Sequence, residues 1–233
     1  MKSYPVYLFD LYGTLIDIHT DESPAAFWND VAAALGKGES GEAIRARYLR
    51  LCADEVSRRA ATLPKVPKDA IEPELLNVFF RLLHTENEAE AKAFARFFRK
   101  RSTEFLRPMP HAKETLDALH ARGARVYLLS NAQSCFTVDE LIETDLLRRL
   151  DAVLLSSDAG MKKPYRGFFE LLLNTYSIDP SSALMVGNDA AADIAGADAV
   201  GLNSAYYHTW TSGPRPNALP ASCIEIPDLS ELV

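Results

Sequence analysis

The sequence lacks an excess of positive charge, a long apolar run and paired cysteines. Lys and Arg number 25 against 32 Asp and Glu, a formal charge of −7, so neither a nucleic-acid footprint nor a polybasic membrane surface is expected. No apolar run approaches the ~18 residues that a membrane helix needs, and the opening run is too brief for a signal peptide. The 3 cysteines lie far apart with no CxxC pair, so no disulfide framework or zinc site is expected. These absences favour a cytoplasmic protein.

What the sequence does contain is enough apolar material for a sizeable core. Hydrophobic residues make up 48% of the 233 residues, which fits one or two globular domains. Short apolar segments predict strands, and these cover residues 6–9, 125–129, 152–155, 183–186 and 202–206. Helical segments, among them residues 139–150 and 190–199, separate the later strands. The pattern therefore predicts a parallel sheet covered on both faces, a Rossmann-like three-layer α/β/α core.

A block of helices interrupts this pattern between the first two predicted strands. Four helices are expected, beginning at Pro24, spanning residues 41–63, beginning near Pro73 and spanning residues 88–106. Phe94, Phe98 and Phe105 recur on one stripe of the fourth helix, which indicates core packing. We therefore expect an all-helical cap, residues 18–106, inserted in a core domain made of residues 1–17 and 107–233. The proline-rich residues after Tyr207 predict an irregular C-terminal extension.

Polar side chains follow the predicted strands at the points where the strands end. In an open parallel sheet these ends line one crevice, which is where ligands bind. The residues expected there are Asp10, Ser130, Asn131, Lys163, Asp189 and Asp193. Taken singly, each has a structural alternative, since Asp10 suits a turn, Ser130 an N-cap and Asp189 a helix cap. As an ordered set they predict a catalytic site.

The ordered set resembles the motifs of the haloacid dehalogenase superfamily of hydrolases, in its helical-cap branch. The segment FDLYGTL, residues 9–15, matches the first motif, an apolar strand followed by Asp-x-Asp-Gly-Thr, except at Tyr12. The other three motifs are matched by Ser130, by Lys163 before Pro164, and by Gly187, Asp189 and Asp193 with Asn188 inserted. The resemblance covers nearly the whole chain apart from the C-terminal extension.

The resemblance implies that Asp10 is a nucleophile that forms an aspartyl-phosphate. A carboxylate that attacks an anion needs its repulsion cancelled, which is a task for Lys163 and a cation. The implied cation is Mg²⁺, held by Asp10, the Tyr12 carbonyl, Asp189 and Asp193. Hydroxyls of Thr14 and Ser130 complete the catalytic set, and the implied substrate contacts are Tyr12, Ser130, Asn131 and Lys163. The expected substrate is a small phosphorylated metabolite, while no sequence feature indicates an oligomeric state.

Tyr12 departs from the family pattern, because phosphatases of the family carry there a second Asp that protonates the leaving group. Tyr at this position resembles the 2-haloacid dehalogenases, which need no metal and release halide without a proton. Arg45 or Arg47 would then receive the halide or the carboxylate. The two acids of the fourth motif favour a phosphatase, since they would repel Asp10 without a cation. A weakly active protein that binds a phosphorylated metabolite is the third alternative.

Overall fold

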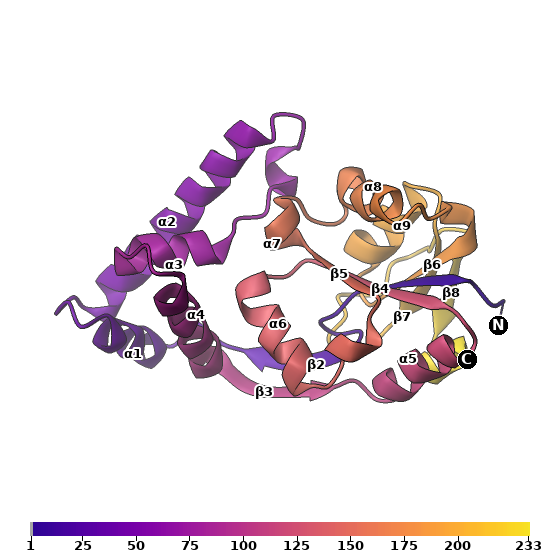
Figure 1. Ribbon diagram of the computed structural model, residues 1–233, viewed down its shortest axis with the longest axis horizontal. Coiled ribbons are helices and arrows are strands. Elements are labelled where there is room, and N and C mark those ends of the chain that lie inside the picture. The colour runs from indigo at the N-terminus through magenta and orange to yellow at the C-terminus, as the bar shows by residue number, and fades with distance from the viewer. Residues whose placement is uncertain (1) are drawn as a thin grey trace.

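The strand that precedes the FDLYGTL turn, β1 (Val6–Phe9), lies in the middle of a parallel sheet. The structure is a computed structural model that describes residues 2–233. Its six-stranded sheet has the order β5-β4-β1-β6-β7-β8, and each neighbouring pair is parallel (Figure 1). The other strands are β4 (Arg125–Ser130), β5 (Ala152–Leu155), β6 (Ala183–Gly187), β7 (Asn203–Tyr207) and β8 (Cys223–Ile226). Phe9 lies beside Leu128 and Val186, so β1, β4 and β6 end together at one edge.

The central strands are apolar because helices cover both faces of the sheet. The helices of this domain are α5 (Ala112–Ala121), α6 (Ser134–Glu143), α7 (Ser156–Ala159), α8 (Arg166–Thr175), η4 (Ala190–Ala195) and α9 (Gly196–Asp198). Successive side chains of β1 point to opposite faces. Phe9 shares one buried cluster with Leu116 of α5, and Leu8 shares another with Phe168 of α8. The predicted three-layer α/β/α core is therefore confirmed.

Two helices of this domain have bounds that differ from the prediction. The helix expected over residues 139–150 is α6, which begins earlier and ends at Glu143. Asp145 follows in a left-handed conformation, with φ 59°, which stops the helix before the 3₁₀ turn η2 (Leu147–Arg149). The helix expected over residues 190–199 begins as a π-helical turn, η4, and continues as the short α9. Such wide turns are frequent at functional sites.

Four helices form an insert that lies beside the sheet domain (Figure 1). They are α1 (Ala25–Leu35), α2 (Gly41–Thr62), α3 (Leu75–Leu83) and α4 (Glu88–Ser102), with a 3₁₀ turn at η1 (Lys68–Ala70). Ser40 and Asn87 start α2 and α4, because their side chains accept hydrogen bonds from the first-turn backbone. We call α1–α4 the helical insert.

The helical insert has an aromatic core of its own. Phe98 of α4 is fully buried, and its ring centroid lies 4.9 Å from that of Phe27 and 5.2 Å from that of Phe79. Phe136 of α6 also joins this cluster, so one helix of the sheet domain contributes to the core of the insert. Edge-to-face and tilted ring pairs of this kind stabilise a core beyond the area that they bury.

An antiparallel ribbon, whose two strands the sequence does not predict, connects the helical insert to the sheet domain. The ribbon pairs β2 (Ile16–Thr20) with β3 (Thr103–Pro108). The expectation that the fourth helix continues to residue 106 is wrong, because α4 ends at Ser102 and Phe105 is 41% exposed on β3. Pairing with β2 outweighs the helical pattern of this segment, and Arg107 donates two hydrogen bonds to the buried Asp17 across the ribbon.

The C-terminal residues are more ordered than the sequence predicts. β8 extends the sheet beside β7, and Ile226 and Leu229 are buried in the core. The last residues form the 3₁₀ turn η5 (Leu229–Leu232). An irregular segment remains over residues 208–222, as expected. The apolar residues of β8 and η5 make this order possible, because they cover one end of the core.

Within residues 2–233, no helix is both long and apolar enough to cross a membrane. The three cysteines are free thiols in partly buried positions. Burial raises the pKa of Cys52 to about 11 and that of Cys135 to about 12. Both therefore stay protonated at neutral pH, which makes them weak nucleophiles and weak metal ligands.

Replacing Phe98 tests the aromatic core of the helical insert. Phe98→Ala is expected to lower the free energy of unfolding by about 3–5 kcal/mol, because it leaves a cavity among buried rings. Phe105→Ala is the matched control, since this ring is 41% exposed on β3. Urea unfolding followed by circular dichroism measures both. Equal losses in the two variants would contradict the assignment of Phe98 to the core.

Candidate functional site

A polar cavity of about 260 Å³ lies where β1, β4 and β6 end. Its lining combines the predicted residues with some that were not predicted: Asp10, Tyr12, Ser130, Asn131, Lys163, Asn188, Asp189, Ala192, Asp193, Thr211, Ser212 and Gly213. The parallel register carries the first residues after each strand to the same edge. The structure thus brings every predicted catalytic, substrate-binding and metal-binding residue to this cavity except Thr14, which contacts Asp10 but does not line the cavity.

Asp10 follows β1 and presents its carboxylate to this cavity. Its backbone N–H donates to the Val186 carbonyl at 2.9 Å, which continues the pairing of β1 with β6. Its Oδ1 atom accepts hydrogen bonds from Lys163 Nζ at 2.6 Å and Ser130 Oγ at 3.3 Å. Its Oδ2 atom accepts only a longer bond, 3.4 Å, from Thr14 Oγ1. One oxygen is therefore fixed, while the other keeps lone pairs for a cation or an electrophile.

Lys163 is a buried ammonium between two carboxylates. Its side chain is 1% exposed, and Nζ lies 2.6 Å from Asp10 Oδ1 and 2.6 Å from Asp193 Oδ1. The third N–H donates to the Leu129 carbonyl at 2.7 Å, so all three donors are satisfied. Burial acts to lower the pKa of Lys163, but the two carboxylates outweigh it and hold the pKa above its usual value. The lysine is therefore charged at neutral pH.

Asn131 contacts the main chain of Lys163. Its Nδ2 donates to the Lys163 carbonyl at 3.0 Å, and its Oδ1 accepts from the Lys163 N–H at 2.8 Å. The amide thus binds both polar groups of that residue's backbone. The geometry makes Asn131 a support of Lys163, in addition to the substrate contact that the resemblance implies.

The two acids of the fourth motif have different environments. Asp193 is 1% exposed, and its Oδ2 accepts from the Asp189 N–H at 3.0 Å. A Cβ at Gly187 would lie 2.2 Å from this oxygen, so only glycine allows the approach. Burial raises the pKa of Asp193, and the Lys163 ammonium opposes that shift. Asp189 instead caps η4, because its Oδ1 accepts from the N–H groups of Ala191 and Ala192.

A magnesium ion fits part of this donor set. Within residues 2–233, no three His, Cys, Asp or Glu side chains are grouped as ligands of one metal ion. Asp193 is instead bound to Lys163. Asp10 Oδ2 and Asp189 Oδ2 keep lone pairs, and both residues line the cavity with Tyr12. Mg²⁺ is commonly bound through one or two carboxylates, with water and substrate phosphate completing the shell. Asp10, Asp189 and the Tyr12 carbonyl therefore suit it.

The hydroxyl of Tyr12 is bound to two side chains of α6. It donates to Glu140 Oε2 at 2.5 Å and lies 2.9 Å from Thr137 Oγ1, both on α6. Burial, followed by the negative charge of Glu140, raises the pKa of Tyr12 above its usual value. Tyr12 is thus a poor proton donor to a leaving group.

The segments beside Asn131 and Lys163 also hold the helical insert in place. Gln133 Oε1 accepts from the Leu75 N–H at 2.8 Å, and its Nε2 donates to the Pro73 carbonyl at 2.9 Å. The Lys162 N–H donates to the Ala70 carbonyl at 3.0 Å. The chain between α2 and α3 is therefore bonded to residues that neighbour the cavity-lining Asn131 and Lys163.

The C-terminal segment supplies a wall of the cavity that sequence reasoning missed. Thr209 Oγ1 donates to the Gly13 carbonyl at 3.2 Å and lies 2.8 Å from Thr211 Oγ1. Asn188 Nδ2 donates to Thr211 at 3.1 Å, while Asn188 Oδ1 accepts from Thr14 at 3.3 Å. Hydroxyl-rich turns are common, and a run such as Thr-Trp-Thr-Ser carries no signal of this contact. The one feature of the sequence that fits this contact is Gly13, because a side chain there would collide with Asn188 and Thr211.

The candidate halide-binding arginines are not part of this cavity. Arg45 is exposed on α2, and Arg47 forms an ion pair with Glu39 at 2.7 Å within the helical insert. Neither lines the site. Their environments favour the surface and packing roles over a contact with substrate.

Comparison with known proteins gives a family match over most of the chain. A family model described as haloacid dehalogenase-like hydrolase matches residues 4–201. A phosphoglycolate phosphatase of Salmonella paratyphi A is 29% identical over 86% of this chain and 81% of its own length. A ribulose-1,5-bisphosphate 5-phosphatase of Halopiger xanaduensis is 37% identical over 99 residues, and the match spans 41% of that protein.

Solved structures of two activities share the fold. A phosphatase from Thermococcus onnurineus has a TM-score of 0.61 at 23% identity, covering 100% of this chain and 96% of that one. A 2-haloacid dehalogenase from Pseudomonas syringae has a TM-score of 0.62 at 22% identity, covering 98% and 96%. At these identities the likeness concerns the fold, which therefore does not separate the two reactions.

Substitution of Gly13 tests the contact between the turn after β1 and the C-terminal segment. A Cβ at Gly13, where φ is +82°, would lie 2.3 Å from Asn188 Nδ2 and 2.4 Å from Thr211 Oγ1. Gly201→Ala is the control, because φ there is +79° and nothing lies within 4 Å. Each variant should lose about 1–2 kcal/mol from the left-handed backbone, and Gly13→Ala about 1–3 kcal/mol more from overpacking. Equal melting temperatures would refute the close contact.

Proposed function

Because the chain belongs to the haloacid dehalogenase-like hydrolase family, we propose that it hydrolyses a small phosphate ester, with Asp10 as nucleophile. The observation that carries the proposal is the Asp10–Lys163–Asp193 contact at the floor of a polar cavity. The phosphatase names of relatives that align with most or part of this chain support the same reaction class.

The first chemical step transfers the phosphoryl group to the protein. The Asp10 carboxylate attacks phosphorus, the bond from phosphorus to the ester oxygen breaks, and the departing oxygen takes a proton from water. Lys163, 2.6 Å from Asp10, offsets the repulsion between the carboxylate and the phosphate. In the second step water attacks the acyl-phosphate, which releases inorganic phosphate and restores the carboxylate.

Mg²⁺ is the proposed cofactor, held by Asp10, Asp189 and the Tyr12 carbonyl. It supplies charge neutralisation and orientation of the phosphoryl oxygens when it is bound. Asp193 acts one step further away, because it orients Lys163 through the 2.6 Å contact and fixes the Asp189 backbone. Ser130 and Thr14 hold the nucleophile in place through hydroxyl contacts.

A metal-independent 2-haloacid dehalogenase is the second candidate. Tyr12 favours it, because halide leaves without a proton and the Tyr12 hydroxyl is already bound to Glu140. Asp10 would then attack the carbon that carries the halogen. Chloride release from 2-chloropropionate in the absence of metal, without phosphatase activity, would establish this alternative.

Removal of the nucleophile is the first test of the proposed reaction. Asp10→Asn should lower phosphate release from p-nitrophenyl phosphate by at least ~10³-fold, and EDTA should reduce the wild-type rate until Mg²⁺ is restored. Asp158→Asn is the control, because this acid also follows a strand but is exposed and outside the cavity lining. Full activity of Asp10→Asn would refute the assignment, and no Mg²⁺ stimulation over a broad panel of esters would refute the phosphatase.

The rate should depend strongly on the leaving group. Because the Tyr12 hydroxyl is bound to Glu140, no acid at this position protonates the departing oxygen. We expect p-nitrophenyl phosphate, whose leaving group needs no proton, to react ~10²-fold to 10⁴-fold faster than a simple alkyl phosphate. Steady-state kinetics on an aryl and alkyl ester series measures this. Similar rates across the series would show that another group acts as the acid.

A further inference from the structure

The turn after Asp10, residues 11–16, is held by hydrogen bonds within the turn and includes Tyr12; we call it the nucleophile turn. The N–H groups of Thr14 and Leu15 donate to the Leu11 carbonyl at 3.2 and 2.8 Å, and the Gly13 N–H donates to the Ile16 carbonyl at 2.7 Å. Tyr12 lies inside this hydrogen-bonded turn, two residues after the nucleophile. A force that fixes the Tyr12 side chain therefore also fixes the backbone on which Asp10 sits.

Glu140 binds this turn to the helical insert. Its Oε2 accepts the Tyr12 hydroxyl at 2.5 Å, and its Oε1 accepts Arg99 Nε of α4 at 2.6 Å. The side chains of Arg99 and Glu140 are 18% and 7% exposed, so their attraction is poorly screened. The Arg99 guanidinium also lies 5.6 Å from the Tyr12 ring centroid. One carboxylate thus spans the nucleophile turn and the last turns of α4.

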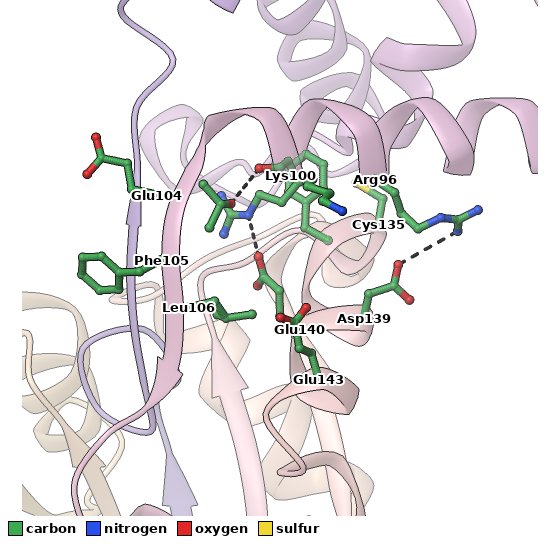
Figure 2. Close-up of a pocket in the computed structure, with 12 residues that line it drawn as sticks. Arg96, Lys100, Glu104, Phe105, Leu106, Cys135, Asp139, Glu140 and Glu143 are labelled. Carbon is green, nitrogen blue, oxygen red and sulfur yellow. Dashed lines mark hydrogen bonds and ion pairs between the residues drawn. The ribbon is translucent and has the colours of Figure 1, made fainter.

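A second ion pair joins the same two helices without reaching the nucleophile turn. Arg96 and Asp139 are 4.0 Å apart, with side chains 55% and 53% exposed. Figure 2 shows Asp139 directed toward Arg96, with Glu140 at the neighbouring position of α6. Both acids line a cavity of about 450 Å³ together with residues of α4 and β3. An exposed pair of this kind contributes little to stability. It therefore serves as an internal control for the buried pair.

We propose that Arg99 and Glu140 are positioning residues. They hold Tyr12, and through it Asp10, in place only when α4 of the helical insert lies against α6. When α4 lies against α6, Arg99 aligns Glu140, and Glu140 holds the Tyr12 hydroxyl. When α4 moves away, Glu140 loses its cationic partner and the turn loses its anchor. Competence of the nucleophile is thus coupled to closure of the insert. The inference rests on the proposed function, in which Asp10 attacks within this site.

The test compares Glu140→Gln with Asp139→Asn in the full-length protein. Glu140→Gln should lower kcat for p-nitrophenyl phosphate roughly 10-fold to 10²-fold, as a misplaced nucleophile does, and leave KM nearly unchanged. Asp139→Asn should match the wild type. Hydrogen–deuterium exchange by mass spectrometry gives a readout that needs no activity. Exchange across residues 11–16 should accelerate in Glu140→Gln and not in Asp139→Asn.

Tyr12→Phe keeps the inference testable if Glu140→Gln fails to fold, because it removes one hydroxyl and retains the ring. It should lower kcat and accelerate exchange over the same residues. The double variant Tyr12→Phe/Glu140→Gln should lose no more than Glu140→Gln alone, since both changes break one chain of contacts. Fully additive losses, or a Glu140→Gln protein identical to Asp139→Asn in kcat and exchange, would overturn the proposal. If even the wild type hydrolyses no ester, the proposed function fails, while the exchange data still decide the positioning role.

Discussion

A buried ammonium holds the site together. The Lys163 side chain is 1% exposed and contacts Asp10 and Asp193, two carboxylates whose proximity would otherwise be unfavourable. The three residues come from separate segments of the chain, and a local feature positions each of them. β1 ends at Phe9, directly before Asp10, Asn131 binds the Lys163 backbone, and Gly187 leaves room for Asp193. The sheet register and these local contacts together bring Asp10 and Asp193 to the Lys163 ammonium.

The sequence predicted the sheet domain well because its signals are local and repeated. Apolar runs and helix start signals predict the succession of strands and helices along the chain. The parallel register then brings the polar residues that follow the strands to one edge of the sheet. The resemblance to known hydrolases added the family, which the match over residues 4–201 shows. The roles of the individual site residues remain predictions, although the geometry places all of them except Thr14 around one cavity.

The parts that sequence reasoning missed depend on contacts between distant residues. The stripe that includes Phe105 predicts a helix, but pairing of β3 with β2 decides its conformation. The hydrogen-bond partners of Tyr12 lie 125 and 128 residues away on α6. No spacing of residues in the sequence therefore predicts these contacts. The same holds for Thr209 and Thr211, which reach the nucleophile turn and Asn188 across the fold. Long-range partners of this kind are set by packing, which a residue pattern does not encode.

The central place of β1 dictates the order in which the molecule can assemble. β1 lies between β4 and β6, and both follow it by more than a hundred residues in the sequence. During synthesis β1 therefore gains neither neighbour until more than a hundred further residues have been added. Contacts of such long sequence separation are slow to form. The core of the helical insert consists mostly of residues of α1–α4, to which Phe136 of α6 is added, so most of its contacts are closer in sequence. We therefore expect most of the insert to form before the sheet closes around β1.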